Sequence, residues 1–453
     1  MTTVFPEHRV SARIMRVLRT LVRFSVGQIA AQIATAVTGL CLVRWLSIPG
    51  YAEFGFSLTF QSTLGLIVDL GVTGAIIALV GDQYRNRAIL GQYMHAGLSL
   101  RTRLLAAASL IGAIAFVYLA SRQGWQPAKQ ASVFGAVLFG LVAQFWSSLY
   151  GVPLIVNQKL GTYYGVQVGA AALRLSCIAG LHRLQLLDSF SALLSGSLAS
   201  LAIALVFKRL TTPYWISGSD VNVEAMRNVL RYIAPLAPGI IFMSIQNQLT
   251  VIIVSYFGVV RAIAEVAALG RLGQVFTLLN AFNAVILGPR FARLDMSRIR
   301  LFYLRTALAA TGVAVLAGCI AFLWPESLLR LLGPKYANLT ESLRFVASAG
   351  CLGYISSVLW SIHSARQWIY WWSTWLFIGL MTAVQVLGII FLDVNTTIGA
   401  SKLTFVTALA ALVVHMSVGV YSLSRRKGMR APSNISLAVA IPMSDSAHAA
   451  SPR

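Results

Sequence analysis

The sequence predicts an all-α integral membrane protein with about 12 transmembrane helices. Hydrophobic residues make up 57% of the chain and charged residues 11%, which does not fit a soluble globular domain. Twelve segments approach the ~20 residues that a helix needs to cross a bilayer. They are continuously apolar, which favours helices over membrane-spanning strands. The predicted spans are 21–46, 54–80, 104–120, 131–153, 163–181, 190–207, 234–257, 264–288, 303–324, 343–363, 370–391 and 400–423.

The longest polar segments divide these spans into two sets of six. A polar linker separates the sets, and polar tails lie before the first span and after the last. The C-terminal tail has the composition of a disordered segment. The predicted organisation is an N-terminal tail at 1–20, a first six-helix bundle at 21–207, a linker at 208–233, a second six-helix bundle at 234–423 and a disordered tail at 424–453.

The net charge of +23 is distributed unevenly between the two sides of the predicted membrane. If the N-terminus is inside, cytoplasmic segments hold 25 Lys/Arg residues, Arg101 and Arg103 among them, and outer loops hold eight. This bias follows the positive-inside rule. It therefore predicts that both termini are cytoplasmic, and it assigns the basic charge to membrane topology and not to nucleic-acid binding.

Three spans carry polar side chains on one helix face. Such a stripe faces either neighbouring helices, as buried hydrogen-bonding groups, or a water-filled cavity, since acyl chains offer no partners. The polar residues of these stripes are Gln28 and Gln32 in span 1, Gln61 in span 2, and Asn247 and Gln248 in span 7.

A few charged residues fall within the predicted spans. Asp69 in span 2 needs a partner or a proton, so we expect a structural pair with an arginine, a coupling-ion site or the counter-charge of a cationic cavity. Arg174 lies near the midplane, where an arginine costs at least ~2.5 kcal/mol, so it should face a cavity or a carboxylate. Arg271 either lines a cavity or is an interfacial anchor. Arg44, at the end of span 1, can also reach lipid headgroups.

A faint repeat relates the two halves of the sequence. Ala-Glu at Glu53 is followed by Gln61, and Ala-Glu at Glu265 is followed by Gln274. The match is either coincidental or the sign of a duplicated transporter, whose site would lie where the repeats meet.

The sequence offers no chemistry typical of a membrane enzyme. It has no GxxxxGK[ST] loop, and no large domain is inserted between spans, so we expect a protein without enzyme activity. The four cysteines fall inside predicted spans without ligand spacing, so neither a metal site nor a cofactor is expected.

Several motifs resemble those of Wzx-type polysaccharide-biosynthesis membrane proteins, which are lipid-linked oligosaccharide flippases. The resemblance is carried by a span-1 arginine before a short loop and by a span 2 that ends in Asp-Leu-Gly, in GQIAAQIATAVTGLCLVRWLSIPGYAEFGFSLTFQSTLGLIVDLGVTGAI. It continues in YFGVVRAIAEVAALGRLGQV, LGPRFARL and SLLRLLGPKYANL.

This resemblance implies the fold of the multidrug/oligosaccharidyl-lipid/polysaccharide exporter superfamily. Two six-helix bundles would surround a central cavity that opens alternately to each side of the bacterial cytoplasmic membrane. The family's cavity is cationic, and the positions that match its motifs here are Arg44, Asp69 and Arg271. Arg174 is added to this site by its depth alone.

The implied function is the flipping of a polyprenyl-pyrophosphate-linked oligosaccharide for surface polysaccharide biosynthesis. The implied partners are this lipid-linked glycan, the bilayer, and polysaccharide polymerase or assembly proteins. Two alternatives stay open. The chain could be a small-molecule exporter of the multidrug-extrusion type, or a non-transporting scaffold of a polysaccharide assembly complex.

Overall fold

The computed structural model describes most of the chain between residues 27 and 424. The described residues are 27–216, 222–246, 248–277, 279–280, 296–366 and 370–424, with the single positions 287, 291, 294 and 368. All regular elements among them are helices. Nine helical segments there are long and apolar enough to cross a membrane, and a bent pair could form a tenth. The predicted all-α membrane fold is confirmed.

The helices follow the order of the predicted spans. The first half of the sequence forms a helix at 27–45, α2 (Ile48–Asp69), α3 (Val72–Val80), α4 (Arg87–Arg122), α5 (Pro127–Val156), α6 (Leu160–Arg183) and α7 (Ser189–Thr211). The second half forms α8 (Val223–Ile233), α9 (Ala237–Gln246), α10 (Leu249–Phe257), α11 (Val260–Leu272), α13 (Met296–Leu323), α14 (Pro325–Leu332), α15 (Thr340–Ala365), α16 (Trp371–Phe391) and α17 (Thr397–Ser424). A short 3-10 turn, Pro334–Tyr336, follows α14.

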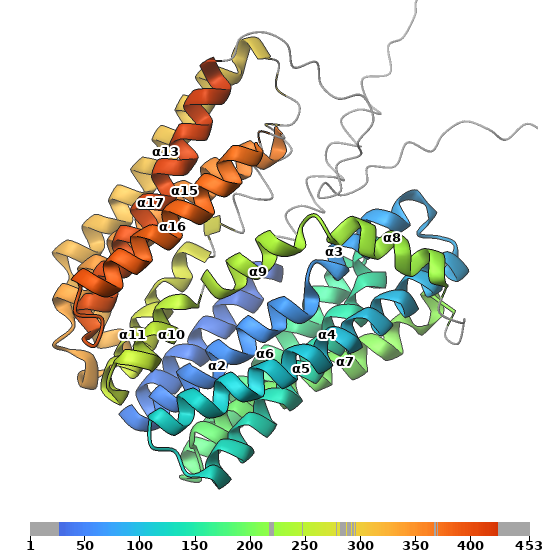
Figure 1. Ribbon diagram of the computed structural model, residues 1–453. Coiled ribbons are helices and arrows are strands. Elements are labelled where there is room, and N and C mark those ends of the chain that lie inside the picture. The colour runs from blue at the N-terminus through green and yellow to red at the C-terminus, as the bar shows by residue number, and fades with distance from the viewer. Residues whose placement is uncertain are drawn as a thin grey trace, which may run out of the picture.

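Two groups of helices diverge from a shared end. In Figure 1, the group that contains α4 to α7 and the group that contains α13 and α15 to α17 meet beside α2, α10 and α11. One buried apolar cluster spans both groups there, with Leu42 and Tyr51 from the first half and Leu269 and Tyr336 from the second. We call this the closed end. Apolar burial there joins the two halves.

The outer surfaces of both groups are apolar. Ile111 and Ile114 on α4, Leu316 on α13 and Ile390 on α16 are each 65–69% exposed. Large apolar side chains at this level of exposure suit contact with acyl chains and not with water.

The helix α4 is much longer than the predicted span 104–120. It begins at Arg87, where the Asn86 side chain accepts hydrogen bonds from the backbone N–H groups of Ala88 and Ile89. Arg101 and Arg103, which precede the predicted span, are therefore part of this helix. Their charges lower the local hydropathy. The span predicted from hydropathy therefore begins at residue 104, well after the start of the helix.

Two predicted spans are interrupted. The Asp-Leu-Gly motif ends α2, because Leu70 and Gly71 both have left-handed backbone conformations, with φ of 42° and 80°. The predicted span 234–257 is divided into α9 and α10, and α8 meets α9 at 59°. Although α9 belongs to the second half of the sequence, it contacts α2, and Ile240 lies beside the break at Gly71.

Candidate functional site

Arg271 reaches from α11 of the second half to two helices of the first half. Its Nε donates a hydrogen bond to the Tyr51 hydroxyl of α2 at 3.1 Å, and its Cζ lies 5.9 Å from the ring centroid of Phe54. On the 27–45 helix, a Cβ added at Gly39 would lie 3.2 Å from Arg271 Cδ. The absence of a side chain at Gly39 makes room for the arginine stem. Arg271 therefore lies at the junction of the halves.

Arg174 lies in a similar recess on the first half. It projects from α6, and a Cβ added at Gly196 of α7 would lie 3.0 Å from its guanidinium carbon. Arg174 Nε is buried and has no hydrogen-bond acceptor among the described residues. An unsatisfied charged donor in a poorly solvated place is costly unless a ligand or water completes it.

The two arginines lie at similar distances along their helices from the closed end, and the positive charge of Arg271 disfavours that of Arg174. Arg271 is eleven residues from the start of α11 at Val260, or ~16 Å along the helix. Arg174 is nine residues from the end of α6 at Arg183, or ~14 Å. Both of these helix ends lie at the closed end, where His182 stacks on Trp45 at 4.5 Å. Neither arginine forms an ion pair with any residue that the structure describes.

The arginine partner expected for Asp69 is Arg101. Arg101 Nη2 lies 2.9 Å from Asp69 Oδ1, and the Thr73 hydroxyl donates to the same oxygen at 2.6 Å. The side chain of Arg101 is 3% exposed and that of Asp69 is 32% exposed, and Arg101 also lies over the ring of Phe145. Asp69 is thus held by a structural pair that joins α2, α3 and α4. Arg101 could not be predicted as this partner because it precedes the predicted span 104–120.

Arg44 lies at the closed end and contacts backbone, away from Arg174. Its guanidinium donates to the carbonyl oxygens of Leu331 at 3.0 Å and Arg330 at 2.5 Å, both at the end of α14. Two of its three nitrogens, Nε and Nη2, are therefore engaged in this conformation.

The predicted glutamines are spread along the helices. Gln28, Gln32, Gln248 and Gln274 are half-buried. Gln61 is also half-buried and faces α5, because a Cβ added at Gly140 would lie 2.5 Å from its Nε2. Asn247 lies outside the described residues, as do the predicted tail 1–20 and all of the predicted tail 424–453 beyond residue 424.

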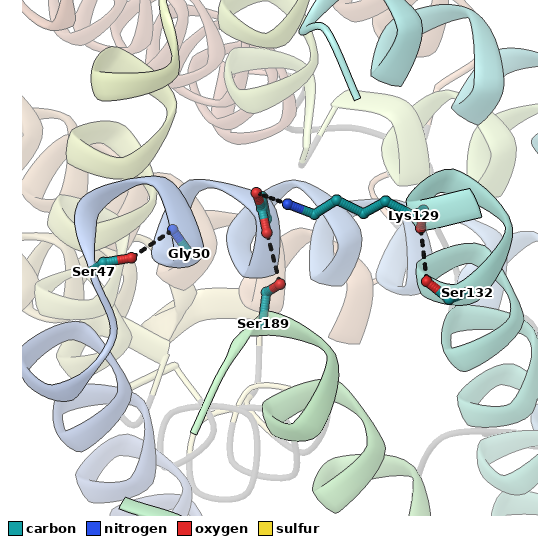
Figure 2. Close-up of polar contacts among 6 residues, drawn as sticks. Ser47, Gly50, Lys129, Ser132 and Ser189 are labelled. Carbon is teal, nitrogen blue, oxygen red and sulfur yellow. Dashed lines mark hydrogen bonds and ion pairs between the residues drawn. The ribbon is translucent and has the colours of Figure 1, made fainter. Parts of the chain in front are cut away.

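The repeated Ala-Glu motifs occupy equivalent places in the two halves. In the first half, Ser189 donates to Glu53 Oε2 at 2.7 Å, and Lys129 pairs with the other carboxylate oxygen. Figure 2 shows Lys129 and Ser189 directed at this one carboxylate. In the second half, Thr397 donates to Glu265, which also pairs with Arg261 at 2.8 Å.

Ser189 begins α7 and Thr397 begins α17, and these are the last described helices of the two halves. Each glutamate therefore ties the second span of its half to the sixth. The same connection in both halves supports duplication over coincidence for the sequence repeat.

Within the described residues, no three His, Cys, Asp or Glu side chains are grouped to hold a metal ion. The site contains two guanidinium groups, Arg271 packed against Gly39 and Arg174 packed against Gly196. Guanidinium groups bind phosphate and carboxylate oxygens bidentately.

Comparison with known proteins identifies the fold. The sequence matches no family model and no curated protein. Among solved structures, the chain is similar to an inward-facing multidrug resistance MATE family transporter of the MOP superfamily, with a TM-score of 0.67 and 13% identity, over 90% of this chain and 99% of that one. It is similar to the lipid II flippase MurJ in an inward closed conformation, with a TM-score of 0.66 and 12% identity, over 88% of this chain and 87% of that one.

A third similarity is to another solved transporter structure. An outward-facing MATE family transporter of the MOP superfamily has a TM-score of 0.53 at 14% identity, over 89% of this chain and 95% of that one. At this level of identity the comparisons establish that the chain has the fold of MOP superfamily transporters.

Proposed function

We propose that this protein is a membrane flippase that translocates a polyprenyl-pyrophosphate-linked oligosaccharide by alternating access. It would act in surface polysaccharide biosynthesis in a bacterial cytoplasmic membrane, with both termini cytoplasmic and with polysaccharide polymerase or assembly proteins as partners. The observation that carries the proposal is the Arg174 and Arg271 pair, which has no ion-pair partner among the described residues.

The charge of this pair favours an anionic substrate. The positive charges of Arg174 and Arg271 disfavour each other, and Arg174 Nε is buried without a hydrogen-bond acceptor among the described residues. A phosphate group between them would relieve the repulsion and accept several charge-assisted hydrogen bonds. Low dielectric surroundings strengthen this attraction. A pyrophosphate headgroup supplies this charge at the point where the glycan joins its lipid.

The position of the pair suits alternating access. Arg271 belongs to the second half and Arg174 to the first, so a bound headgroup would contact both halves. When the halves rock about a fixed site, the headgroup can be exposed to one side and then to the other. The glycan would cross between the halves, while the polyprenyl tail stays in the lipid.

The main competing function is export of cationic small molecules. The similarity to MATE transporters is as strong as the similarity to MurJ. However, cationic substrates are best held by free carboxylates. Asp69 is already paired with Arg101, and Glu53 and Glu265 are paired with Lys129 and Arg261. The charges at the junction of the halves therefore favour a flippase.

Reconstitution into liposomes tests the substrate class. A fluorescent polyprenyl-pyrophosphate sugar is incorporated, and its passage between leaflets is followed with a membrane-impermeant quencher. A matched polyprenyl glycoside that lacks phosphate serves as the control lipid. We expect the pyrophosphate lipid to cross about tenfold faster than the neutral one, which corresponds to one charge-assisted hydrogen bond.

Equal rates for both lipids would contradict phosphate recognition. Uptake of a cationic dye, without movement of either lipid, would establish the multidrug-extrusion alternative. No transport of lipid or dye by protein that is folded in the liposomes would favour the scaffold alternative.

A further inference from the structure

At the closed end, the first half of the molecule holds a helix end of the second half. Arg44, in the last turn of the 27–45 helix, donates from Nε and Nη2 to the carbonyl oxygens of Leu331 and Arg330. These carbonyls belong to the last turn of α14, which ends at Leu332. The last four carbonyls of a helix have no partner within the helix, and a cation there is favoured by the helix dipole.

A basic residue of the second half makes an equivalent contact with the first half. Lys335, in the turn after α14, donates from Nζ to the carbonyl oxygen of Arg44 at 2.9 Å and also to that of Leu46. Arg44 lies in the last turn of the 27–45 helix, and Leu46 directly follows that helix. Each half thus uses one basic side chain to cap a helix C-terminus of the other half. The exchange is reciprocal, although the two residues are 291 positions apart.

The local backbone is shaped for this exchange. Gly333 has a φ of 102°, a conformation that side chains rarely adopt, and it turns the chain sharply between α14 and Lys335. A Cβ added at Gly333 would lie 3.5 Å from Arg44 Cγ, so the arginine stem packs directly on this turn. Burial lowers the pKa of Lys335, and the two carbonyl oxygens replace water around its ammonium group.

An apolar seal lies beside the exchange. Leu332 and Tyr336, next to Gly333 and Lys335, are at most 1% exposed and belong to the cluster shared by the two halves. Arg44 itself is exposed. Water can therefore reach the arginine and compete for its carbonyl partners, so these bonds can be made and broken singly.

We propose that Arg44 and Lys335 form an interlocking clamp that holds the closed end shut and must release before the molecule opens at that end. This rests on the proposed alternating access, because a protein with one conformation needs no such release. Both residues come from motifs noted in the sequence, LVRWLSIPG and LLGPKYANL. The clamp gives these motifs a role in gating and gives Arg44 a role other than substrate binding.

Accessibility of a buried reporter tests the clamp without measuring transport. The reporter is Ala52→Cys, because Ala52 is 1% exposed and lies in the shared apolar cluster. The four native cysteines are replaced by alanine, and the full chain in proteoliposomes is treated with a membrane-impermeant maleimide. Arg44→Ala removes the hydrogen bonds to the end of α14. Lys335→Met removes the hydrogen bonds to the end of the 27–45 helix while keeping an unbranched side chain of similar length.

We expect each single variant to raise the rate of reporter labelling about threefold and the double variant about tenfold, since two sets of charge-assisted bonds are lost. Arg330→Ala is the matched control. It removes a positive charge from the same helix, but the carbonyl oxygen that Arg44 binds remains, so labelling should stay at the starting rate.

Unchanged labelling in the double variant would overturn the clamp, and so would an equal rise in Arg330→Ala. Size-exclusion chromatography of every variant identifies unfolding, which would expose the reporter for another reason. If Arg44→Ala unfolds, the labelling of Lys335→Met alone tests the clamp. Lys335 is only half-buried, so this replacement should leave the protein folded. Neither labelling result depends on which lipid is moved, so failure of the clamp and failure of the proposed substrate are distinguishable.

Discussion

The two helix bundles are alike at the closed end and different farther along their spans. At the closed end, Glu53 accepts from the first residue of α7, and Glu265 accepts from the first residue of α17. Away from it, the first bundle contains the Asp69–Arg101 ion pair, whereas the second contains a neutral contact between Tyr303 and His363 at 3.4 Å. Both bundles therefore share the contacts at the closed end, and within the described residues an ion pair farther along the spans occurs in the first bundle alone.

The largest expected effect is on the charged inner pair. Asp69→Asn leaves the guanidinium of Arg101, which is 3% exposed, without its counter-charge. Breaking such a pair costs about 3 kcal/mol, at the low end of the usual range because Asp69 is partly exposed. We expect a lower melting temperature in detergent and less protein in the membrane. Adding Arg101→Met to Asp69→Asn should recover at least half of the loss, because it removes the unpaired charge.

His363→Phe in the second bundle is the matched comparison for Asp69→Asn. His363 is 1% exposed, and its Nδ1 has no hydrogen-bond partner among the described residues. Replacing it removes one long hydrogen bond, so the loss should stay near 1 kcal/mol. If His363→Phe lowers stability as much as Asp69→Asn does, the inner contacts of the two bundles contribute equally to stability, which would contradict this comparison.

A smaller and symmetrical effect is expected at the duplicated glutamates. Glu53→Gln and Glu265→Gln each keep the side-chain shape but remove the charge that Lys129 or Arg261 pairs with. Each should cost about 1 kcal/mol, because both basic partners are substantially exposed and their ion pairs are screened by water. Melting temperatures of the two variants should fall by similar amounts. A large fall for only one of them would show that the repeat is not equivalent in the two halves.

Much of the fold could be predicted from the sequence, because the membrane restricts the possible structures. Continuous apolar segments require helices, and Asp69 required a partner, which the structure supplies. The identity of that partner could not be predicted, because Arg101 and Arg103 lower the hydropathy of the first part of α4 and moved its predicted start. The breaks within the spans depend on backbone conformation at Leu70 and Gly71, which hydropathy does not report.

The candidate site was predictable only in part. The depth of Arg174 in its span predicted a mid-membrane position, and in the structure Arg174 lies nine residues before the end of α6. The role of Arg44 could not be anticipated, because it depends on a contact with the end of α14, nearly 290 residues away in the sequence. Contacts between residues so far apart leave no local pattern in the sequence.

Transport by arginine variants at the junction of the halves tests the central claim most directly. Arg174 and Arg271 are each changed to Lys and to Ala, and the transfer of the pyrophosphate-linked sugar between leaflets is measured at equal protein amounts. Arg183→Ala, at the exposed end of α6, is the control for loss of a positive charge. Lysine keeps the charge but cannot bind phosphate bidentately, so rates should fall in the order Arg, Lys, Ala at both positions, with Arg183→Ala unchanged. Full transport by the double alanine variant would contradict the account.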